Sequence, residues 1–557
     1  MLKKILSFGQ KHSEILIISG LAVIFYLLFF FNIGNYYLMD VDETRYVAMA
    51  RDMFHSKNFL TLYLNGEFFF EKPPLYFWHE CMSFFLFGGK VNEFTARFPV
   101  ALLGFILSFA TYFTSKHWVN RKFGIVSSLV LATSVEFLIL SKYAILDIVL
   151  TFYVCLALIC FISTYYCQEK HEKIYWWLFY IFTGLGVMAK GIPAPAIAFG
   201  GAFICSLITG KLKKMFKPVN FLVGIILFTL IILPWHIIML KIHGNVFFDE
   251  YIIKHHWHRF FNSQDIGRKR PFLYYFGVIL WGFIPWIFSS VAVLIERIKN
   301  ITKNKFYEKY KKFSELDNSH KLIYIASVLA IWIMLFFSSS STKLATYILP
   351  IYYPMALLCG FLWVDYTENK MHTKPINISV VSVGTIFIIA GTVALFSGLF
   401  LPQDISYYIN DIKILWSCIL IIFGILSILF VKYKKYTNIF ILYVVFMMII
   451  SMFGTKQFFE LDYKFGQNDL VEFAKYAQSQ NKTISANGMN RKYSLIYYNN
   501  KKVDYNDEDM DVNIITEDLN RKNNLVILKL KNYDQIKDNL KCNIVKTGKR
   551  YIMIEGL

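Results

Sequence analysis

The sequence predicts a polytopic α-helical membrane protein with about 13 transmembrane helices and a C-terminal α/β domain. Of its 557 residues, 56% are hydrophobic and only 17% are charged, a composition outside the range of soluble globular proteins. Apolar runs of about 20 residues, the length that crosses a bilayer, recur from the N-terminus onward. They stop near residue 455, where shorter and more polar patterns begin.

The apolar runs are separated by short loops, and the basic residues fall in alternate loops. A cytoplasmic N-terminus places all the lysine-rich loops on one side, as the positive-inside rule requires. We therefore predict a transmembrane domain over 1–455, with an outer loop at 35–92, and an outer domain over 456–557. The candidate spans lie near 14–34, 94–114, 123–140, 145–166, 175–190, 192–209, 220–240, 271–295, 321–338, 346–364, 376–399, 412–431 and 438–454.

The formal net charge of +20 does not indicate nucleic-acid binding, because the basic residues form short clusters between apolar runs. The eight cysteines have no metal-type spacing and predict neither a disulfide framework nor a zinc knuckle. The composition instead predicts that membrane lipids surround most of the chain.

The outer loop carries most of the ionisable chemistry. It opens with Asp40, Asp42 and Glu43 at the end of the first apolar run, where desolvation raises the pKa of a carboxylate towards that of a general base. The alternative is a solvated helix end. Two amphipathic helices are expected in the interface plane, over 43–54 and 74–87.

The C-terminal region has the pattern of a small α/β domain. Residues 468–478 form an amphipathic stretch, and β-rich runs follow at 493–498, 524–530 and 551–554.

Further polar groups fall on the same predicted side of the membrane. Lys72 is held between Glu71 and two prolines, and a phosphate is the natural partner of such a fixed cation, although a snorkelling lysine is the alternative. Asp147 begins a span, and acids in or at the ends of spans are costly and indicate function. The others are His255, His256, His258 and Arg259, which could bind zinc or form an interfacial patch, and Lys343 and Tyr347, which helical spacing places on one face.

Several motifs resemble those of the bacterial 4-amino-4-deoxy-L-arabinose lipid A transferases and the related protein O-mannosyltransferases, which share the C-type glycosyltransferase (GT-C) fold. The resemblance covers the first 350 or so residues in the family order. The matching stretches are DETRY at 42–46, FEKP at 70–73, YAILD at 143–147, GVMAKG at 186–191, LPW at 233–235, HWHRF at 256–260, PFLYY at 271–275 and KLATYIL at 343–349.

The resemblance implies transfer of a sugar from a polyprenyl-phosphate donor, with Asp42 as the catalytic carboxylate and Asp147 as a second important acid. It assigns the donor phosphate to a group of basic and tyrosine side chains, which are Arg45, Lys72, Arg259, Lys343 and Tyr347. Glu71 and His256 match positions that can hold zinc. Two positions depart from the family pattern: Phe69 stands in place of a frequent tyrosine, and His255 in place of a frequent glutamate.

The predicted function is therefore an inverting glycosyltransferase of the bacterial inner membrane with its active site facing the periplasm. The acceptor would be lipid A or another envelope glycan or lipid. A protein O-glycosyltransferase is the first alternative. A secondary transporter is a further one, but it would need ionisable residues near the centres of the spans, and a membrane receptor or assembly factor is another.

Overall fold

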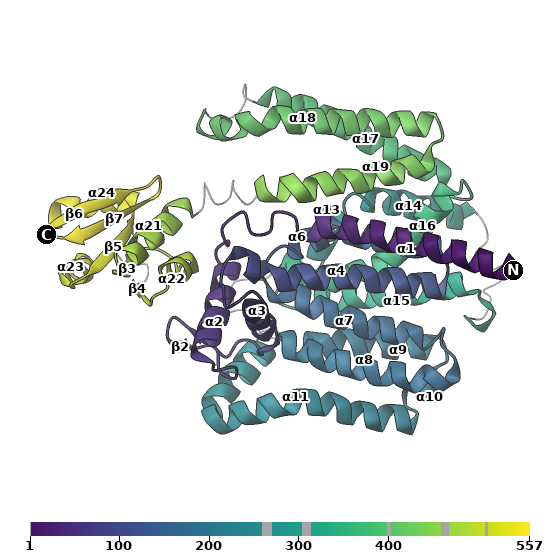
Figure 1. Ribbon diagram of the computed structural model, residues 1–557, viewed down its shortest axis with the longest axis horizontal. Coiled ribbons are helices and arrows are strands. Elements are labelled where there is room, and N and C mark those ends of the chain that lie inside the picture. The colour runs from purple at the N-terminus through teal and green to yellow at the C-terminus, as the bar shows by residue number, and fades with distance from the viewer. Residues whose placement is uncertain (1, 259–269, 304–312, 398–402, 458–466, 507–510) are drawn as a thin grey trace. The chain divides into compact units, whose positions relative to one another are not determined.

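The computed structural model describes residues 2–258, 270–303, 313–397, 403–457, 467–506 and 511–557. Most of these residues are helical, and every predicted apolar run overlaps a helix or a pair of helices (Figure 1). Contacts divide the chain into two units. The first comprises Met1–Phe31, Val100–Lys142 and Leu146–Gly454, and the second comprises Asn32–Pro99, Tyr143–Ile145 and Thr455–Leu557.

The first unit is a bundle of helices, most of them apolar. They are α1 (Leu2–Phe29), α4 (Glu93–Trp118), α5 (Arg121–Ala132), α6 (Val135–Leu140), α7 (Leu146–Ser163), α8 (Glu169–Lys190), α9 (Pro193–Ile208), α10 (Leu212–Met215), α11 (Pro218–Phe247), α13 (Tyr274–Gly282), α14 (Ile287–Lys303), α15 (Asn318–Ser339), α16 (Tyr352–Thr367), α17 (Thr373–Leu395), α18 (Gln403–Lys432) and α19 (Tyr436–Ile449). The π- and 3₁₀-helical segments are η1 (Phe248–His258), η2 (Phe313–Glu315), η3 (Ala345–Ile351) and η5 (Ile450–Gly454).

Eight helices of the described residues are long and apolar enough to cross a membrane, and the bent pair α13 and α14 would make nine. The expected number of about 13 is not confirmed. Some predicted runs are realised as shorter or interrupted helices: α9 has only 16 residues, and α5 and α6 are separate helices. Hydropathy reveals an apolar run but not the breaks within it.

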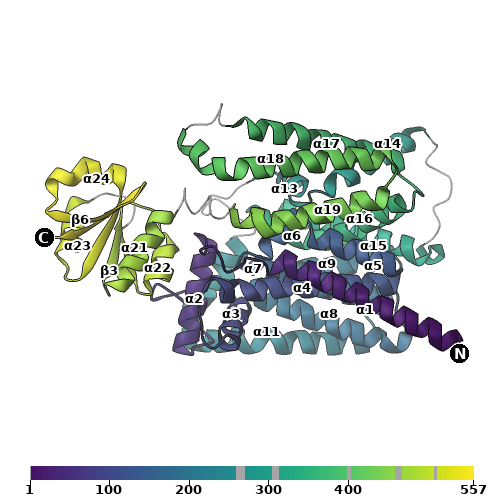
Figure 2. The ribbon, with the colours of Figure 1, turned by 45° about the horizontal axis from the view of Figure 1, so that its top comes forward.

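Helices α17 and α18 run side by side in both views (Figures 1 and 2). Glycines allow the close approach, since a Cβ added at Gly424 would lie 2.4 Å from the carbonyl oxygen of Gly384. A Cβ at Gly384 would in turn lie 2.9 Å from the carbonyl oxygen of Gly424. Small residues at such crossings let the backbones of membrane helices meet directly.

The second unit contains the predicted outer loop. The two expected interfacial helices are present as α2 (Asp42–Ser56) and α3 (Leu75–Leu86). Between them β1 (Tyr63–Leu64) and β2 (Glu67–Phe68) form an antiparallel hairpin. Its turn residues Asn65 and Gly66 have φ angles of 56° and 85°, the left-handed conformation that an Asn-Gly turn favours.

The C-terminal region, also in the second unit, has a five-stranded sheet in the order β4-β3-β5-β7-β6. The first three strands are parallel, and β7 is antiparallel to both β5 and β6. Its elements are α21 (Asn468–Ser479), β3 (Thr483–Asn487), α22 (Tyr493–Asn499), β4 (Val503–Asn506), α23 (Val512–Asn520), β5 (Asn524–Lys529), α24 (Leu530–Ile536), η6 (Lys537–Asn539), β6 (Cys542–Thr547) and β7 (Tyr551–Gly556).

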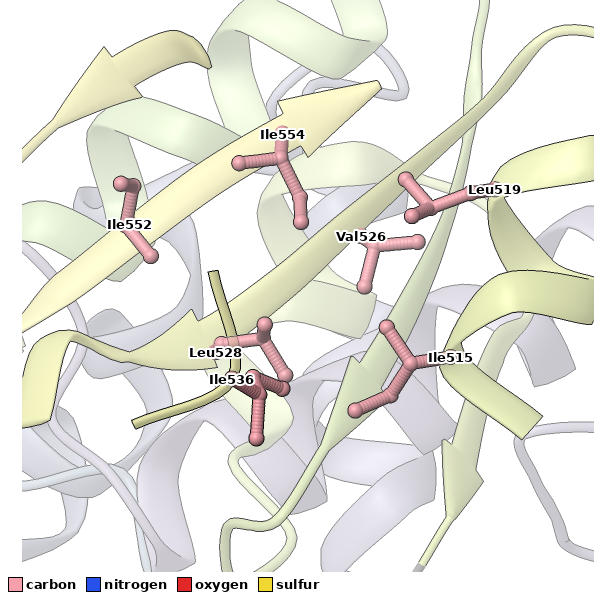
Figure 3. Packing of buried hydrophobic residues seen from close by; sticks show 7 residues of the cluster. All are labelled: Ile515, Leu519, Val526, Leu528, Ile536, Ile552 and Ile554. Carbon is pink, nitrogen blue, oxygen red and sulfur yellow. The ribbon is translucent and has the colours of Figure 1, made fainter. Parts of the chain in front are cut away.

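The core of this region lies between the sheet and the helices that cover it. Figure 3 shows seven aliphatic side chains from the strands and helices packed together, and each is at most 8% exposed. They are Ile515, Leu519, Val526, Leu528, Ile536, Ile552 and Ile554. Such a core confirms the predicted α/β character of the C-terminal region.

One predicted β-run of this region is wrong. Residues 493–498 form helix α22 rather than a strand, although tyrosine and isoleucine favour strands. The six residues from Ser494 to Asn499 are all buried, and α22 packs against both α21 and α2. Burial on all sides removes the alternation that a half-buried strand would need, so tertiary packing overrides the local preference. The division by contacts groups the 35–92 loop with the C-terminal region, and the predicted domain boundaries stay a prediction.

Candidate active site

The first turn of α2 presents a carboxylate and a guanidinium on one face. Arg45 Nη2 lies 2.8 Å from Asp42 Oδ1, and it also donates a hydrogen bond of 2.9 Å to the hydroxyl of Tyr46. The spacing of three residues along a helix produces this pairing. The Asp42 side chain is 49% exposed and that of Arg45 is 18% exposed. Asp42 can therefore meet a substrate, while Arg45 is held beneath the surface.

The surroundings of Arg45 favour its charged form. Burial alone would lower the pKa of Arg45, but Tyr46, Asp42 and Glu71 together raise the pKa above its ordinary value. The Arg45 Nε atom is buried and has no hydrogen-bond partner among the described residues. A buried donor without a partner is costly. The guanidinium therefore has hydrogen-bonding capacity left for an anion.

Glu43, next to Asp42, forms a fully buried ion pair with Arg97 of α4. Arg97 Nε and Nη2 lie 2.8 and 2.7 Å from the two Glu43 carboxylate oxygens, and both side chains are 0% exposed. The Glu43 oxygens also accept from the backbone N–H groups of Met39 and Ala144, each at 2.9 Å or less.

The remaining donors of Arg97 bind the backbone that leads into α2. The guanidinium donates to the carbonyl oxygens of Ile33, Tyr36 and Tyr37 at 2.8 to 2.9 Å. All five N–H donors of Arg97 are thus used, which is the condition for a buried ion pair to be tolerated. Sequence reasoning missed Arg97 as a site residue, although an arginine inside the predicted span 94–114 was a signal.

Asp40 has different partners from Asp42. Its carboxylate accepts hydrogen bonds from the Thr44 hydroxyl at 2.6 Å and from the backbone N–H and hydroxyl of Ser494 at 2.8 and 2.6 Å. Asp40 therefore joins the first turn of α2 to α22. All of these donors belong to the protein itself.

The structure brings Glu71 and Lys72 to the same unit as Asp42. Lys72 Nζ lies 3.1 Å from the carbonyl oxygen of Glu71, and Glu71 is close enough to raise the pKa of Arg45. Phe69 and Phe70, which precede them, are buried. Lys72 is half-buried, and Glu71 next to it in sequence lies near Arg45.

In the first unit, Asp147 and Tyr347 meet through Lys190. Lys190 Nζ lies 2.5 Å from Asp147 Oδ1 and 4.1 Å from the centre of the Tyr347 ring. Asp147 is in the first turn of α7, Lys190 ends α8, and Tyr347 is in η3. The Asp147 and Lys190 side chains are only 12% and 11% exposed. Sequence reasoning did not select Lys190, although it noted the motif that contains it.

Lys343 is not on a helical face with Tyr347, which corrects the predicted spacing. Leu344 between them has an extended backbone, and η3 begins only at Ala345. Lys343 Nζ instead donates to the backbone carbonyl oxygens of Ser340 and Arg270. With the side chain 5% exposed, these contacts fix the turn after α15.

Arg259 lies outside the residues that the structure describes, and so does the side chain of His256. Within the described part, no group of three or more His, Cys, Asp or Glu side chains could hold a metal ion. The zinc site at Glu71 and His256 therefore stays a prediction.

Comparison with known proteins bears on the fold. The model of the dolichyl-phosphate-mannose-protein mannosyltransferase family matches residues 14–249. ArnT from Cupriavidus metallidurans, solved with bound undecaprenyl phosphate, matches with a TM-score of 0.77 and 17% identity over 98% of both chains. The chain has the C-type glycosyltransferase fold. The archaeal oligosaccharyltransferase AglB from Archaeoglobus fulgidus matches with a TM-score of 0.51 and 12% identity. The match covers 94% of this chain and 70% of the AglB chain.

Sequence relatives confirm the family resemblance of this GT-C protein. The undecaprenyl phosphate-alpha-4-amino-4-deoxy-L-arabinose arabinosyl transferase of Yersinia enterocolitica is 26% identical over 64% of this chain and 61% of its own length. The enzyme of the same name from Wigglesworthia glossinidia brevipalpis is 28% identical over 74% and 72%. The chain thus matches less than two thirds of the Yersinia relative.

Proposed function

We propose that the protein is an integral-membrane glycosyltransferase that moves a sugar from undecaprenyl phosphate to lipid A or another envelope glycan or lipid. The observation that carries the proposal is the first turn of α2, where an exposed carboxylate adjoins a charged guanidinium with an unpaired buried donor. The fold is that of an ArnT solved with undecaprenyl phosphate, and two relatives are named as undecaprenyl-phosphate sugar transferases.

In the proposed reaction, an acceptor oxygen attacks the anomeric carbon of the sugar with inversion. The bond from that carbon to the phosphate oxygen breaks, and undecaprenyl phosphate leaves with the bonding electron pair. Asp42 accepts the proton of an acceptor hydroxyl, or orients an acceptor that is already ionised. Arg45 and Lys72 stabilise the negative charge that grows on the leaving phosphate, the effect that usually dominates such catalysis.

A second cluster, of Asp147, Lys190 and Tyr347, lies within the first unit. Lys190 keeps Asp147 paired and lies against the Tyr347 ring, so the three groups act as one fixed arrangement. We assign Asp147 and Tyr347 to the sugar-phosphate end of the donor, with Lys190 holding both. Arg259 keeps its assignment to the donor phosphate by motif alone. Lys343 likewise keeps its assignment to the donor phosphate by motif, and its carbonyl contacts hold it at the turn after α15.

The setting of the proposed reaction is the bacterial inner membrane, with the site facing the periplasm. The distribution of lysines among alternate loops supports this orientation. A donor whose polyprenyl tail lies among the helices would present its head group at the same face.

The test is transfer from labelled undecaprenyl phosphate-linked 4-amino-4-deoxy-L-arabinose to lipid A by purified protein in nanodiscs. Lys72→Ala should lower the rate roughly ten- to a hundredfold, because a charge-assisted contact contributes about 1.5–3 kcal/mol. Lys213→Ala, which removes an exposed lysine of α10, is the matched control and should keep the wild-type rate. Equal rates for the two variants would remove Lys72 from the site.

A protein O-glycosyltransferase is the second candidate, because the matching family model is that of protein mannosyltransferases. Supplying the same assay with periplasmic protein and a mannosyl donor separates the two acceptors. A transporter would move the labelled sugar into vesicles without a covalent product. Elemental analysis of the purified protein, compared with Glu71→Gln, tests the zinc prediction without relying on activity.

A further inference from the structure

The C-terminal region reaches the backbone that leads into α2. Gln467 Nε2 donates to the carbonyl oxygen of Leu38 at 2.7 Å, and Gln467 Oε1 accepts from the backbone N–H of Asp40 at 2.6 Å. The hydroxyl of Tyr498 accepts from the backbone N–H of Leu38 at 2.9 Å. These partners pair the polar backbone of residues 38–40, which lies just before Asp42.

The Asp40 carboxylate extends this connection into the first turn of α2. One of its oxygens accepts from both the Thr44 hydroxyl and the Ser494 backbone N–H, and the other accepts from the Ser494 hydroxyl. Thr44 lies between Asp42 and Arg45 in the same turn. Ser494 thus holds, through Asp40, the piece of backbone that carries both proposed reaction groups.

Tyr493, the residue before Ser494, lies beside Arg45. The Arg45 guanidinium carbon is 4.7 Å from the centre of the Tyr46 ring and 5.9 Å from that of Tyr493. The backbone before Tyr493 is fixed, because the Tyr505 hydroxyl donates to the Lys492 carbonyl oxygen at 2.5 Å. An aromatic ring near a buried guanidinium stabilises its charge and limits its orientations.

We propose that Tyr493 and Ser494 are positioning residues of the transfer reaction, so that the C-terminal region is a working part of the site. Ser494 sets the place of Asp42 by anchoring Asp40, and Tyr493 sets the direction of the Arg45 guanidinium. The inference rests on the proposed function, since Asp42 and Arg45 take their roles from it.

Other contacts keep the C-terminal region attached when either residue is changed. Arg51 Nη1 donates to the Tyr497 carbonyl oxygen at 2.9 Å, and the Asn65 side chain bonds both the N–H and the carbonyl oxygen of Val503 at 2.9 and 2.8 Å. Single substitutions at 493 and 494 therefore report on positioning rather than on detachment.

The experiment measures kcat and donor KM in nanodiscs for Ser494→Ala, Ser494→Thr and Tyr493→Ala. Ser494→Ala should lower kcat about tenfold with little change in KM, because a hydrogen bond to a charged group is lost. Ser494→Thr retains the hydroxyl and should restore kcat. Tyr493→Ala should raise the donor KM about two- to fivefold, the size of a partly exposed cation–π contact.

Two matched controls lie in the same region away from α2. Among the described residues, Ser479 donates to the Tyr476 carbonyl oxygen at an exposed helix end, and the Tyr476 ring lies 4.9 Å from Lys546 Nζ. Ser479→Ala and Tyr476→Ala should leave kcat and KM unchanged. If they lower activity as much as the test variants do, the effect is general to the region and the proposal is wrong.

Hydrogen exchange gives a second readout that does not need activity. Amide exchange in residues 38–46 should be faster in Ser494→Ala than in the wild type, and Ser494→Thr should reverse the change. Wild-type exchange in Ser494→Ala, with wild-type kcat, would overturn the inference. Faster exchange in a protein that transfers no sugar from any polyprenyl-phosphate donor would instead overturn the proposed function and leave the anchoring role of Ser494 established.

Discussion

Asp40 and Asp42 are two residues apart and carry the same charge, yet their partners give them separate roles. Asp40 is held by Thr44 and Ser494, while the half-exposed Asp42 contacts Arg45 alone among the hydrogen-bond partners found in the described residues. A carboxylate already saturated with internal donors cannot readily accept a proton from a substrate. The available carboxylate is the one at Asp42.

Asp42→Asn should therefore abolish transfer and leave donor binding largely intact. Asp40→Asn should keep substantial activity, because the amide oxygen can still accept from Thr44 and Ser494 while its NH₂ group faces the Ser494 hydroxyl. Both variants are compared by rate and by donor affinity in the same nanodisc preparation. An inactive Asp40→Asn beside an active Asp42→Asn would exchange the two assignments.

Glu80 of α3 gives a second prediction at the scale of one residue. It is 0% exposed and accepts a hydrogen bond from Tyr76 at 2.7 Å. Burial raises the pKa of Glu80 well above its ordinary value of 4.5, with Glu43 adding to the effect. The folded protein thus keeps a proton that the unfolded chain has lost, so the free energy of unfolding falls as the pH rises above that value.

Glu80→Gln removes this dependence and keeps an acceptor for Tyr76. The difference in melting temperature, variant minus wild type, should be more positive at pH 8 than at pH 5. The control is Glu67→Gln, which changes an exposed carboxylate on β2 and should show no such trend. If the melting temperature of Glu80→Gln minus that of the wild type became smaller from pH 5 to pH 8, Glu80 would be ionised in the folded protein.

At the scale of elements, the α17 and α18 pair depends on backbone contact at Gly384 and Gly424. Gly424→Ala would place a methyl group 2.4 Å from a backbone oxygen that cannot turn away. Overpacking of this kind costs about 1–3 kcal/mol, so the melting temperature should fall. Gly20→Ala is the matched control, since its added Cβ in α1 would meet nothing within 4 Å. Equal melting temperatures for the two variants would show that the helices separate without cost.

The elements also show what sequence could predict. The apolar runs predicted the helices because a span is a local property of about 20 consecutive residues. Arg97 and Lys190 were missed as site residues because their partners are 54 and 43 residues away. Helix α22 was mistaken for a strand because its conformation depends on burial against α2 and α21. The helical face expected for Lys343 and Tyr347 was wrong because the sequence does not show that the backbone is extended at Leu344.

At the scale of the whole molecule, the lysine distribution predicts which loops face the outside. Cysteines introduced at the exposed positions Glu67 and Lys502 should react with a membrane-impermeant maleimide in spheroplasts. A cysteine at Lys213 should react only after the membrane is permeabilised. The unsubstituted protein, with its own cysteines, gives the background labelling. The opposite pattern would reverse the orientation and place the proposed site in the cytoplasm.

The contact between Asp40 and Ser494 also has a consequence for biosynthesis. These two residues are 454 positions apart in the chain. Ser494 is synthesised after all of the apolar helices. Until the C-terminal region has been synthesised and exported, Asp40 therefore lacks the hydrogen bonds that Ser494 donates to it. A chain that ends before Ser494 would therefore lack the contact that holds the first turn of α2, and we expect the proposed transfer to reach its full rate only after the C-terminal region has been made.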